Sequence, residues 1–220
     1  MQKKKLLIFG NGEIAELANF YFSKFTNYDV VGFVIDDIFY KESIFCDKPI
    51  IKLSEIKKKY STHLFNFFVA LGYKKTNQIR KEKYEFIKKM GYSFASFLSP
   101  SAIILNNDLI GENCFILENN VIQPHVKIGD NVTLWSGNHV GHHSTIGNHC
   151  FVSSHVVISG GVTIGEQVFL GVNSTIKDHI EIGEKSIIGA GCCILKNVEK
   201  ESIYFQENSN KSRIPSTKLR

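Results

Sequence analysis

Aliphatic residues recur at every sixth position through the second half of the chain. The series has sixteen unbroken members: Ile104, Ile110, Ile116, Ile122, Ile128, Leu134, Val140, Ile146, Val152, Ile158, Ile164, Leu170, Ile176, Ile182, Ile188 and Ile194. An α-helix places apolar residues every three or four positions and a half-buried strand every two, so neither element alone explains a period of six. The period is typical of a chain that forms a short strand, turns a corner and completes three such sides per coil.

Each coil of such a structure takes eighteen residues, and Ile-Gly pairs mark this longer period. The pairs occur at 110–111, 128–129, 146–147, 164–165 and 182–183. We expect each aliphatic side chain to point into a three-sided prism, where burial stabilises the fold by about 1.5–3 kcal/mol per side chain. The five glycines are expected in one corner column, in a turn conformation that is closed to other residues.

The first 97 residues show a different pattern, in which apolar strands alternate with helices. Strands are expected at 4–9, 30–35, 64–71 and 92–98, and helices from the segment after residue 12 to about 25, at 53–60 and at 76–90. The apolar face expected for the first helix consists of Leu17, Ala18, Phe20, Tyr21 and Phe25. Such alternation predicts a small, Rossmann-like parallel sheet. The chain therefore divides into a sheet domain at 1–97, a parallel β-helix at 98–198 and a tail at 199–220.

A glycine-rich turn follows the first expected strand. Gly10, Asn11 and Gly12 lie where a phosphate-binding loop would open the next helix, so that backbone N–H groups face a pyrophosphate. Asp36 and Asp37 end the second strand and are candidates for binding a nucleoside. The same residues also fit a tight turn and a solvated turn. A complete dehydrogenase domain would need more strands, so nicotinamide chemistry is not expected.

Composition excludes several classes of protein. The five cysteines form no Cys-x-x-Cys pair, which argues against a disulfide framework and a zinc ribbon. The net charge of +5 is spread along the chain, so nucleic acid is not an expected partner, although a nucleotide would be tolerated. No apolar run approaches the roughly 20 residues of a membrane span, and a cytoplasmic location is the expectation.

A truncated nucleotide-binding sheet, hexapeptide coils and Val-Gly-His-His at 140–143 together resemble bacterial sugar acyltransferases of the sialic acid O-acetyltransferase NeuD family. The resemblance covers about residues 3–200. It implies a left-handed β-helix, a homotrimer with active sites between adjacent β-helices, and acetyl-CoA as cosubstrate. It also implies N-acetylation of a nucleotide-linked amino sugar for surface polysaccharide, with a 4-amino-4,6-dideoxy sugar as one candidate.

The resemblance also assigns roles to individual residues. His142 falls on the position of the general base, and a histidine, with an ordinary pKa near ~6.5, can accept a proton at neutral pH. His143 stands where relatives commonly have Glu. Gly160 and Ala190 match positions whose backbone contacts the cofactor, and His155 is expected to face the same cleft. The glycine-rich turn and the acidic pair match the nucleotide-binding segment.

A zinc site is not expected. Trimeric β-helices that act as carbonic anhydrases typically carry two ligands as His-x-x-x-x-His on one chain. The intervals along His139, His142, His143, His149 and His155 are 3, 1, 6 and 6, so no neighbouring pair has that spacing.

Alternatives stay open at this point. His142 also fits a solvated corner residue, and the same base would serve O-acetylation of a sugar hydroxyl; a non-catalytic trimer that binds a nucleotide sugar is a further reading. His125 and His179 fall in the column of His143, while Asn138 and Glu118 are polar residues expected near the cleft. Relatives often carry Gly-x-Pro-Ala-Lys near the end, but residues 212–218 read Ser-Arg-Ile-Pro-Ser-Thr-Lys, so no cofactor contact is assigned there.

Overall fold

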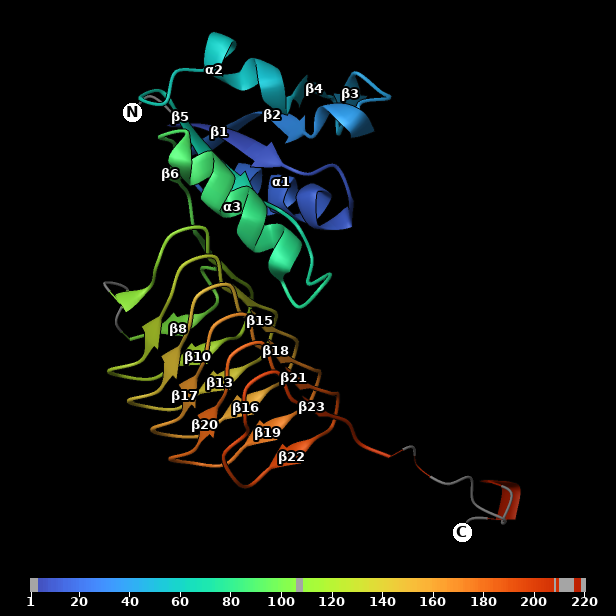
Figure 1. The fold of residues 1–220 in the computed structure, drawn as a ribbon, viewed down its shortest axis with the longest axis vertical. Helices are drawn as coiled ribbons and strands as arrows, with labels where there is room; N and C mark the ends of the chain where they lie inside the picture. Colours follow the sequence, from blue (N-terminus) through green and yellow to red (C-terminus); the bar gives the residue numbers. More distant parts are fainter. Residues whose placement is uncertain (1–3, 106–108, 208, 210–215, 219–220) are drawn as a thin grey trace.

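The computed structural model describes residues 4–105, 109–207, 209 and 216–218. A sheet flanked by helices stands at one end of a stack of coils (Figure 1). Residues 212–218 of the tail differ from the Gly-x-Pro-Ala-Lys pattern of relatives, and the first four of them, 212–215, lie outside the described residues. Within the described ranges, no helix has the length and apolar character needed to cross a membrane.

The N-terminal sheet has the strand order β3-β4-β2-β1-β5-β6 and is parallel except for the β3–β4 pair. Its strands are β1 (Lys4–Phe9), β2 (Tyr28–Ile35), β3 (Ile44–Phe45), β4 (Lys48–Lys52), β5 (Phe65–Val69) and β6 (Ser93–Phe94). The helices are α1 (Glu13–Phe25), η1 (Asp37–Phe39), η2 (Leu53–Glu55), α2 (Ile56–Lys59) and α3 (Gln78–Lys89).

Both faces of this sheet are covered, as the alternation along β1 shows. Leu6 and Ile8 pack in one core with α1, whereas Leu7 and Phe9 pack in a second core with α2 and α3. Because successive strand residues point to opposite faces, a strand buried on both sides reads as a continuous apolar run. The expected strand at 4–9 is confirmed for this reason.

Some N-terminal predictions are wrong in detail. The face of α1 that is fully buried consists of Ala15, Ala18 and Phe22, and Phe20 and Phe25 are exposed. The hairpin of β3 and β4 was not predicted. Residues 92–98 form two short strands, because β7 (Phe97–Leu98) pairs with a coil strand and not with the sheet.

The coils form a three-sided parallel β-helix, which confirms the interpretation of the six-residue period. The first side contains β7, β9 (Phe115–Ile116), β12 (Thr133–Leu134), β15 (Phe151–Val152), β18 (Phe169–Leu170), β21 (Ile187–Ile188) and β23 (Ile203–Tyr204). The second contains β8 (Ile103–Ile104), β10 (Val121–Ile122), β13 (His139–Val140), β16 (Val157–Ile158), β19 (Thr175–Ile176) and β22 (Cys193–Ile194). The third contains β11 (Lys127–Ile128), β14 (Thr145–Ile146), β17 (Thr163–Ile164) and β20 (Glu181–Ile182); a short helix, η4 (Ser216–Lys218), lies in the tail.

Three corners join these sides, and we number them by the sides they connect. The first corner joins the first side to the second, the second corner joins the second side to the third, and the third corner returns to the first side. At each corner one residue has a left-handed conformation, with positive φ at every sixth position from 113 to 191. Asn, His and Gly dominate this series, as expected where a left-handed residue is required.

The conformation expected for the Ile-Gly glycines is wrong. The glycines at 111, 129, 147, 165 and 183 lie outside the left-handed region, which is occupied two positions later in the corner. Instead, a Cβ on Gly129 would lie 2.9 Å from the backbone N of Asn148, and a Cβ on Gly165 would lie 2.7 Å from that of Glu184. Close stacking of successive coils therefore excludes a side chain at this column.

The N-terminal sheet domain and the coils share a packed interface. Phe97, Phe115 and Leu117 belong to the same apolar core as α1. On the other side, the buried guanidinium of Arg80 donates from Nη2 to the carbonyl oxygen of Cys150 at 2.8 Å and from Nη1 to Thr133. These contacts fix α1 over the first corner and α3 along the third.

Candidate active site

His142 is exposed on the second corner, immediately after the buried strand β13. Its backbone N–H donates to Oε1 of Gln123 at 2.9 Å, and its carbonyl oxygen accepts from the N–H of Gly161 at 2.8 Å. Nδ1 of its ring lies 3.1 Å from Nδ1 of His143, so the two imidazoles form a hydrogen bond in which one nitrogen carries the proton. The corner thus holds the backbone of His142 rigidly while its ring faces solvent.

Gly160 lies directly beneath the ring of His142, one coil further on. A Cβ at this position would approach Cε1 at 2.8 Å and Nε2 at 3.0 Å. Its carbonyl oxygen accepts from the N–H of His179, whereas within the described chain its own N–H has no backbone acceptor. The imidazole therefore stands beside an available backbone donor, the pair that the sequence assigned to one site.

The other corner histidines have a simpler explanation. His125, His143, His149, His155 and His179 all have positive φ, between 55° and 65°. Each occupies the left-handed corner position that Asn fills elsewhere in the coils, so conformation accounts for their spacing. The rings of the first two lie in one column, with centroids 4.6 Å apart and planes tilted by 39°.

Several candidates do not join His142 within one chain. His155 and Ala190 lie at the first corner, between β15 and β16 and between β21 and β22, whereas His142 lies at the second corner. Asn138, expected near a cleft, is buried; its Oδ1 accepts from the N–H of Val156 at 2.8 Å. Its role is therefore structural.

His149 and Glu118 are held in hydrogen-bond networks. His149 lies at the third corner, where burial lowers the pKa of its ring to about 4. At the first corner, Glu118 accepts from Tyr21 and, at 2.9 Å, from Ser136. Hydrogen bonding from both hydroxyls holds the pKa of this carboxyl below its usual value, although burial acts in the opposite direction. No three metal-ligating side chains come together in the part of the chain that the structure describes.

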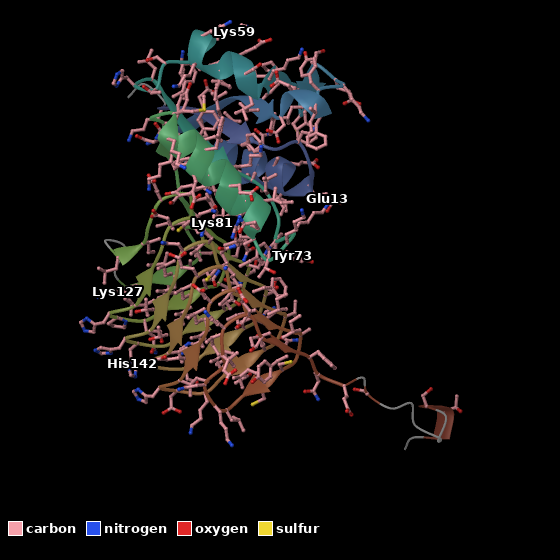
Figure 2. All side chains as sticks on the ribbon, viewed as in Figure 1. Glu13, Lys59, Tyr73, Lys81, Lys127 and His142 are labelled. Carbon is pink, nitrogen blue, oxygen red and sulfur yellow. The ribbon has the colours of Figure 1, made fainter. Side chains whose placement is uncertain are left out.

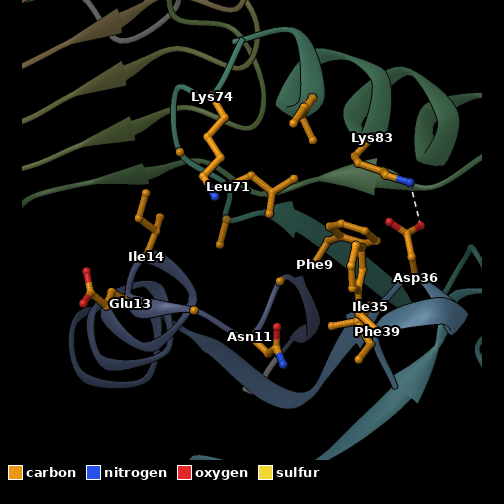
Figure 3. A pocket seen from close by; sticks show the side chains of 15 residues that line it. Phe9, Asn11, Glu13, Ile14, Ile35, Asp36, Phe39, Leu71, Lys74 and Lys83 are labelled. Carbon is orange, nitrogen blue, oxygen red and sulfur yellow. Dashed lines mark hydrogen bonds and ion pairs between the residues drawn. The ribbon is translucent and has the colours of Figure 1, made fainter. Parts of the chain in front are cut away.

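A cavity of about 460 Å³ lies between the end of β1, the start of α1 and the start of α3 (Figure 3). Gly10, Asn11 and Gly12 all line it. Gly10 has φ +122°, and a Cβ there would lie 2.8 Å from the carbonyl oxygen of Ala70, while Gly12 opens onto free space. The α1 N-terminus thus exposes backbone N–H groups to the cavity, the geometry suited to a phosphate.

The acidic pair after β2 is divided between two tasks. Asp36 lines the cavity, and its Oδ1 lies 2.6 Å from Nζ of Lys83 (Figure 3). Asp37 does not line the cavity, because its carboxylate accepts from the backbone N–H and the hydroxyl of Ser54, at 3.1 and 2.5 Å. Those hydrogen bonds lower the pKa of Asp37. Of the two expected acidic residues, Asp36 therefore lines the cavity, and Asp37 is bound to Ser54 outside it.

A second hollow, of about 330 Å³, adjoins the first and shares two of its residues, Glu13 and Ile14. Its other wall is the first corner of the coils, with Trp135, Ser153 and Ser154. Tyr73 closes it from the loop before α3. The two hollows meet at Glu13 and Ile14, and we refer to them together as the path, which runs from the glycine-rich turn to the first corner of the coils.

The path and His142 lie on different edges of the molecule. Figure 2 shows His142 at one edge of the coils and Tyr73 at the opposite side, where the loop before α3 meets them, with Glu13 above Tyr73 on α1. One side of the prism, at most about 20 Å long for six residues, separates the first corner from the second. Within a single chain, the imidazole and the path therefore lie at different corners of the prism.

Comparison with known proteins agrees with this architecture. The family described as bacterial transferase hexapeptide (six repeats) matches residues 109–142, 128–160 and 161–196. Together these matches run from residue 109 to residue 196. These repeats supply all three sides of the prism at the level of His142.

Solved structures extend the likeness to nearly the whole chain. The acetyltransferase domain of PglB from Neisseria gonorrhoeae is 21% identical, with a TM-score of 0.78, and the match covers 89% of this chain and 93% of that one. PerB from Caulobacter crescentus, in complex with CoA and GDP-perosamine, is 22% identical with a TM-score of 0.79, covering 90% and 92%. WeeI from Acinetobacter baumannii is 17% identical, with a TM-score of 0.60 and coverage of 90% and 94%. The sheet and the hexapeptide coils therefore recur together as one fold.

Sequence reasoning missed several residues of the path. Lys74 and Lys83 bring positive charge to the cavity, Phe39 also lines the cavity, and Trp135 lines the second hollow. They come from separate segments, and no local motif marks any of them. Only an expectation of which loops meet at the carboxyl ends of the parallel strands would have found the first three.

Proposed function

We propose that this protein is an acetyl-CoA-dependent N-acetyltransferase that acts on a nucleotide-linked amino sugar. The observation that carries the proposal is the placement of His142 over Gly160. In this proposal the N-terminal sheet is Rossmann-like, and the turn from Gly10 to Gly12 is the phosphate-binding loop of its nucleotide site. The fold shared with PglB and with PerB, the latter in complex with CoA and GDP-perosamine, supports the same assignment.

The chain's own groups suit the chemistry of acetyl transfer. The sugar amine forms a C–N bond to the thioester carbonyl carbon, the C–S bond breaks, and CoA leaves as a thiolate that becomes the thiol when it takes the proton back from His142. Nε2 of His142, exposed on the opposite side of the ring from the His143 contact, accepts the proton that the nitrogen loses. The N–H of Gly160 donates to the carbonyl oxygen as negative charge develops on it. The absence of a Cβ on Gly160 lets the ring of His142 lie directly against the backbone of Gly160.

His143 takes the place of an orienting carboxylate in this proposal. Its Nδ1 contact with His142 fixes the ring through a neutral partner. Because one nitrogen of this contact must donate and the other accept, the pair functions with one proton between them. A second proton would break the contact.

The separation of the path from His142 favours a homotrimer. If copies pack side by side, the first corner of one chain faces the second corner of its neighbour. The path of one copy, with Trp135 and Ser154, would then open onto the imidazole of the next. His155 and Ala190 would enter the same interface from the first corner, which restores their expected contact with the cofactor.

Substitution of His142 tests the proposal. We expect His142→Ala to lower kcat by roughly 10²–10⁴-fold, the usual contribution of a general base, with thiol release measured against a panel of nucleotide-linked amino sugars. His179→Asn is the matched control, because it alters another exposed corner histidine and keeps a residue suited to positive φ. Full transfer by His142→Ala would reject the base. If the wild-type protein acetylates hydroxyl acceptors and no amines, it is instead an O-acetyltransferase.

A further inference from the structure

Phe39 is a large apolar side chain that the fold leaves open to solvent. It is 61% exposed, yet it lines the cavity beside Ile35 and Asp36 (Figure 3). We propose that the ring of Phe39 is the stacking platform for the nucleobase of the substrate, an inference that rests on the nucleotide binding of the proposed function. Base–aromatic stacking needs one open ring face, which Phe39 provides.

The layout of the cavity decides which end receives the base. Asn11, in the turn between Gly10 and Gly12, lies between Ile14 and Phe39 (Figure 3), and a diphosphate fits at this turn beside the α1 N-terminus. Ile14 lies at the end that continues into the second hollow and the coils. In a nucleotide-linked sugar the sugar and the nucleoside leave the diphosphate in opposite directions. With the sugar directed to the coils, the base comes to the end where Phe39 stands.

The platform is built before any ligand arrives. Phe39 belongs to the short helix η1, and the carboxylate of Asp37 at its start accepts two hydrogen bonds from Ser54. The N–H of Phe39 donates to the carbonyl oxygen of Asp36 at 2.9 Å. Because the turn is already fixed, little ordering entropy is lost on binding. This gives Asp37 a purpose that its distance from the cavity would otherwise leave unexplained.

Polar groups at the same end complement the ring. The 2.6 Å pair of Asp36 and Lys83 offers a carboxylate acceptor and an ammonium donor to the ribose or to the edge of the base. Lys83 also lies 5.6 Å from the ring centroid of Phe9, so its ammonium is held over this part of the cavity. The end therefore combines one aromatic face with one donor and one acceptor, the features that recognise a nucleoside.

Binding of UDP, dTDP, GDP and ADP, with inorganic pyrophosphate as the base-free probe, tests the inference by titration calorimetry. We expect Phe39→Leu to weaken the nucleotide that wild type prefers by roughly 10- to 100-fold and to leave pyrophosphate affinity unchanged, while Phe39→Trp retains nucleotide binding. Ile38→Ala is the control, because Ile38 is 82% exposed and outside the cavity.

The outcomes separate this inference from the proposed function. If wild type binds a nucleotide and Phe39→Leu binds it equally well, the platform is wrong while the proposed function stands. If wild type binds none of the four nucleotides, the nucleotide site itself is wrong. An equal loss of nucleotide and pyrophosphate in Phe39→Leu would also overturn the platform, because it would show damage to the whole cavity.

Discussion

At the scale of single residues, conformation explains most of the histidines around the coils. Five of the eight occupy left-handed corner positions, where Asn, His and Gly are the tolerated types. His142 does not: it precedes the left-handed residue of its corner, and its ring lies over a glycine. A role in chemistry is therefore argued for His142 from its surroundings, whereas in the sequence only the family resemblance distinguished it from its neighbours.

Gly160→Ala tests whether the surface beneath the imidazole must stay bare. The new Cβ would lie within 3.2 Å of three ring atoms of His142, so the exposed ring must move while the backbone need not. Because small misplacements of a catalytic group can cost about 10²-fold, we expect kcat/KM to fall by roughly 10- to 100-fold with little change in Tm. Gly12→Ala, which meets no atom within 4 Å, is the stability control. Wild-type kcat/KM in Gly160→Ala would contradict the assigned geometry.

At the scale of elements, the sequence predicted the coils well because one aliphatic residue per side repeats without a gap. It did not reveal the second inward position, two residues earlier on each side, which holds smaller residues such as Cys114, Val132 and Ser144. Alternation along a strand places both positions inside the prism, but the mixed chemistry of this set conceals its period. The β3–β4 hairpin was missed similarly, because its strands are short and Pro49 interrupts the second.

The third corner contains a buried polar ladder that should make stability depend on pH. Nδ2 of Asn113 donates to Oδ1 of Asn131 at 2.7 Å, and Nδ2 of Asn131 lies 2.9 Å from Nδ1 of His149. A neutral ring accepts this hydrogen bond, and a protonated ring cannot. Burial, followed by the charge of Lys81, lowers the pKa of His149 to about 4.

The sign of the effect follows from this lowered pKa. The unfolded chain takes up the proton near pH 6.5, before the folded chain does, so the contribution is complete above pH 6.5 and is lost as pH falls towards 4. The difference corresponds to about 3 kcal/mol. We expect His149→Asn, which suits positive φ and extends the ladder, to show less loss of unfolding free energy between pH 7 and 4 in urea titrations. Parallel losses in variant and wild type would disprove this origin.

At the scale of the whole molecule, the two ends of the site come from distant parts of the chain. The glycine-rich turn could be read locally, but Lys83, Phe39 and Trp135 meet the path only through tertiary packing. Arg80 shows how that packing is fixed: it is buried on α3, and its guanidinium bonds to β12 and to the corner before β15. No periodic pattern in the sequence predicts such a contact, because it joins a single helix residue outside any repeat to a backbone carbonyl oxygen.

Mixing of two inactive variants tests whether the path and the imidazole belong to different copies. His142→Ala removes the base, and Gly12→Asp places a like charge where a diphosphate should bind. Each variant alone should be inactive for its own reason. If each site takes its path from one chain and its imidazole from the next, random trimers formed by co-expression restore about one site in four, because both chains must be of the right kind by chance. Separately purified variants mixed without exchange of subunits are the control. Zero activity in verified mixed trimers would mean that each chain carries a complete site, and the separation between the two corners would then have to close by movement within the chain.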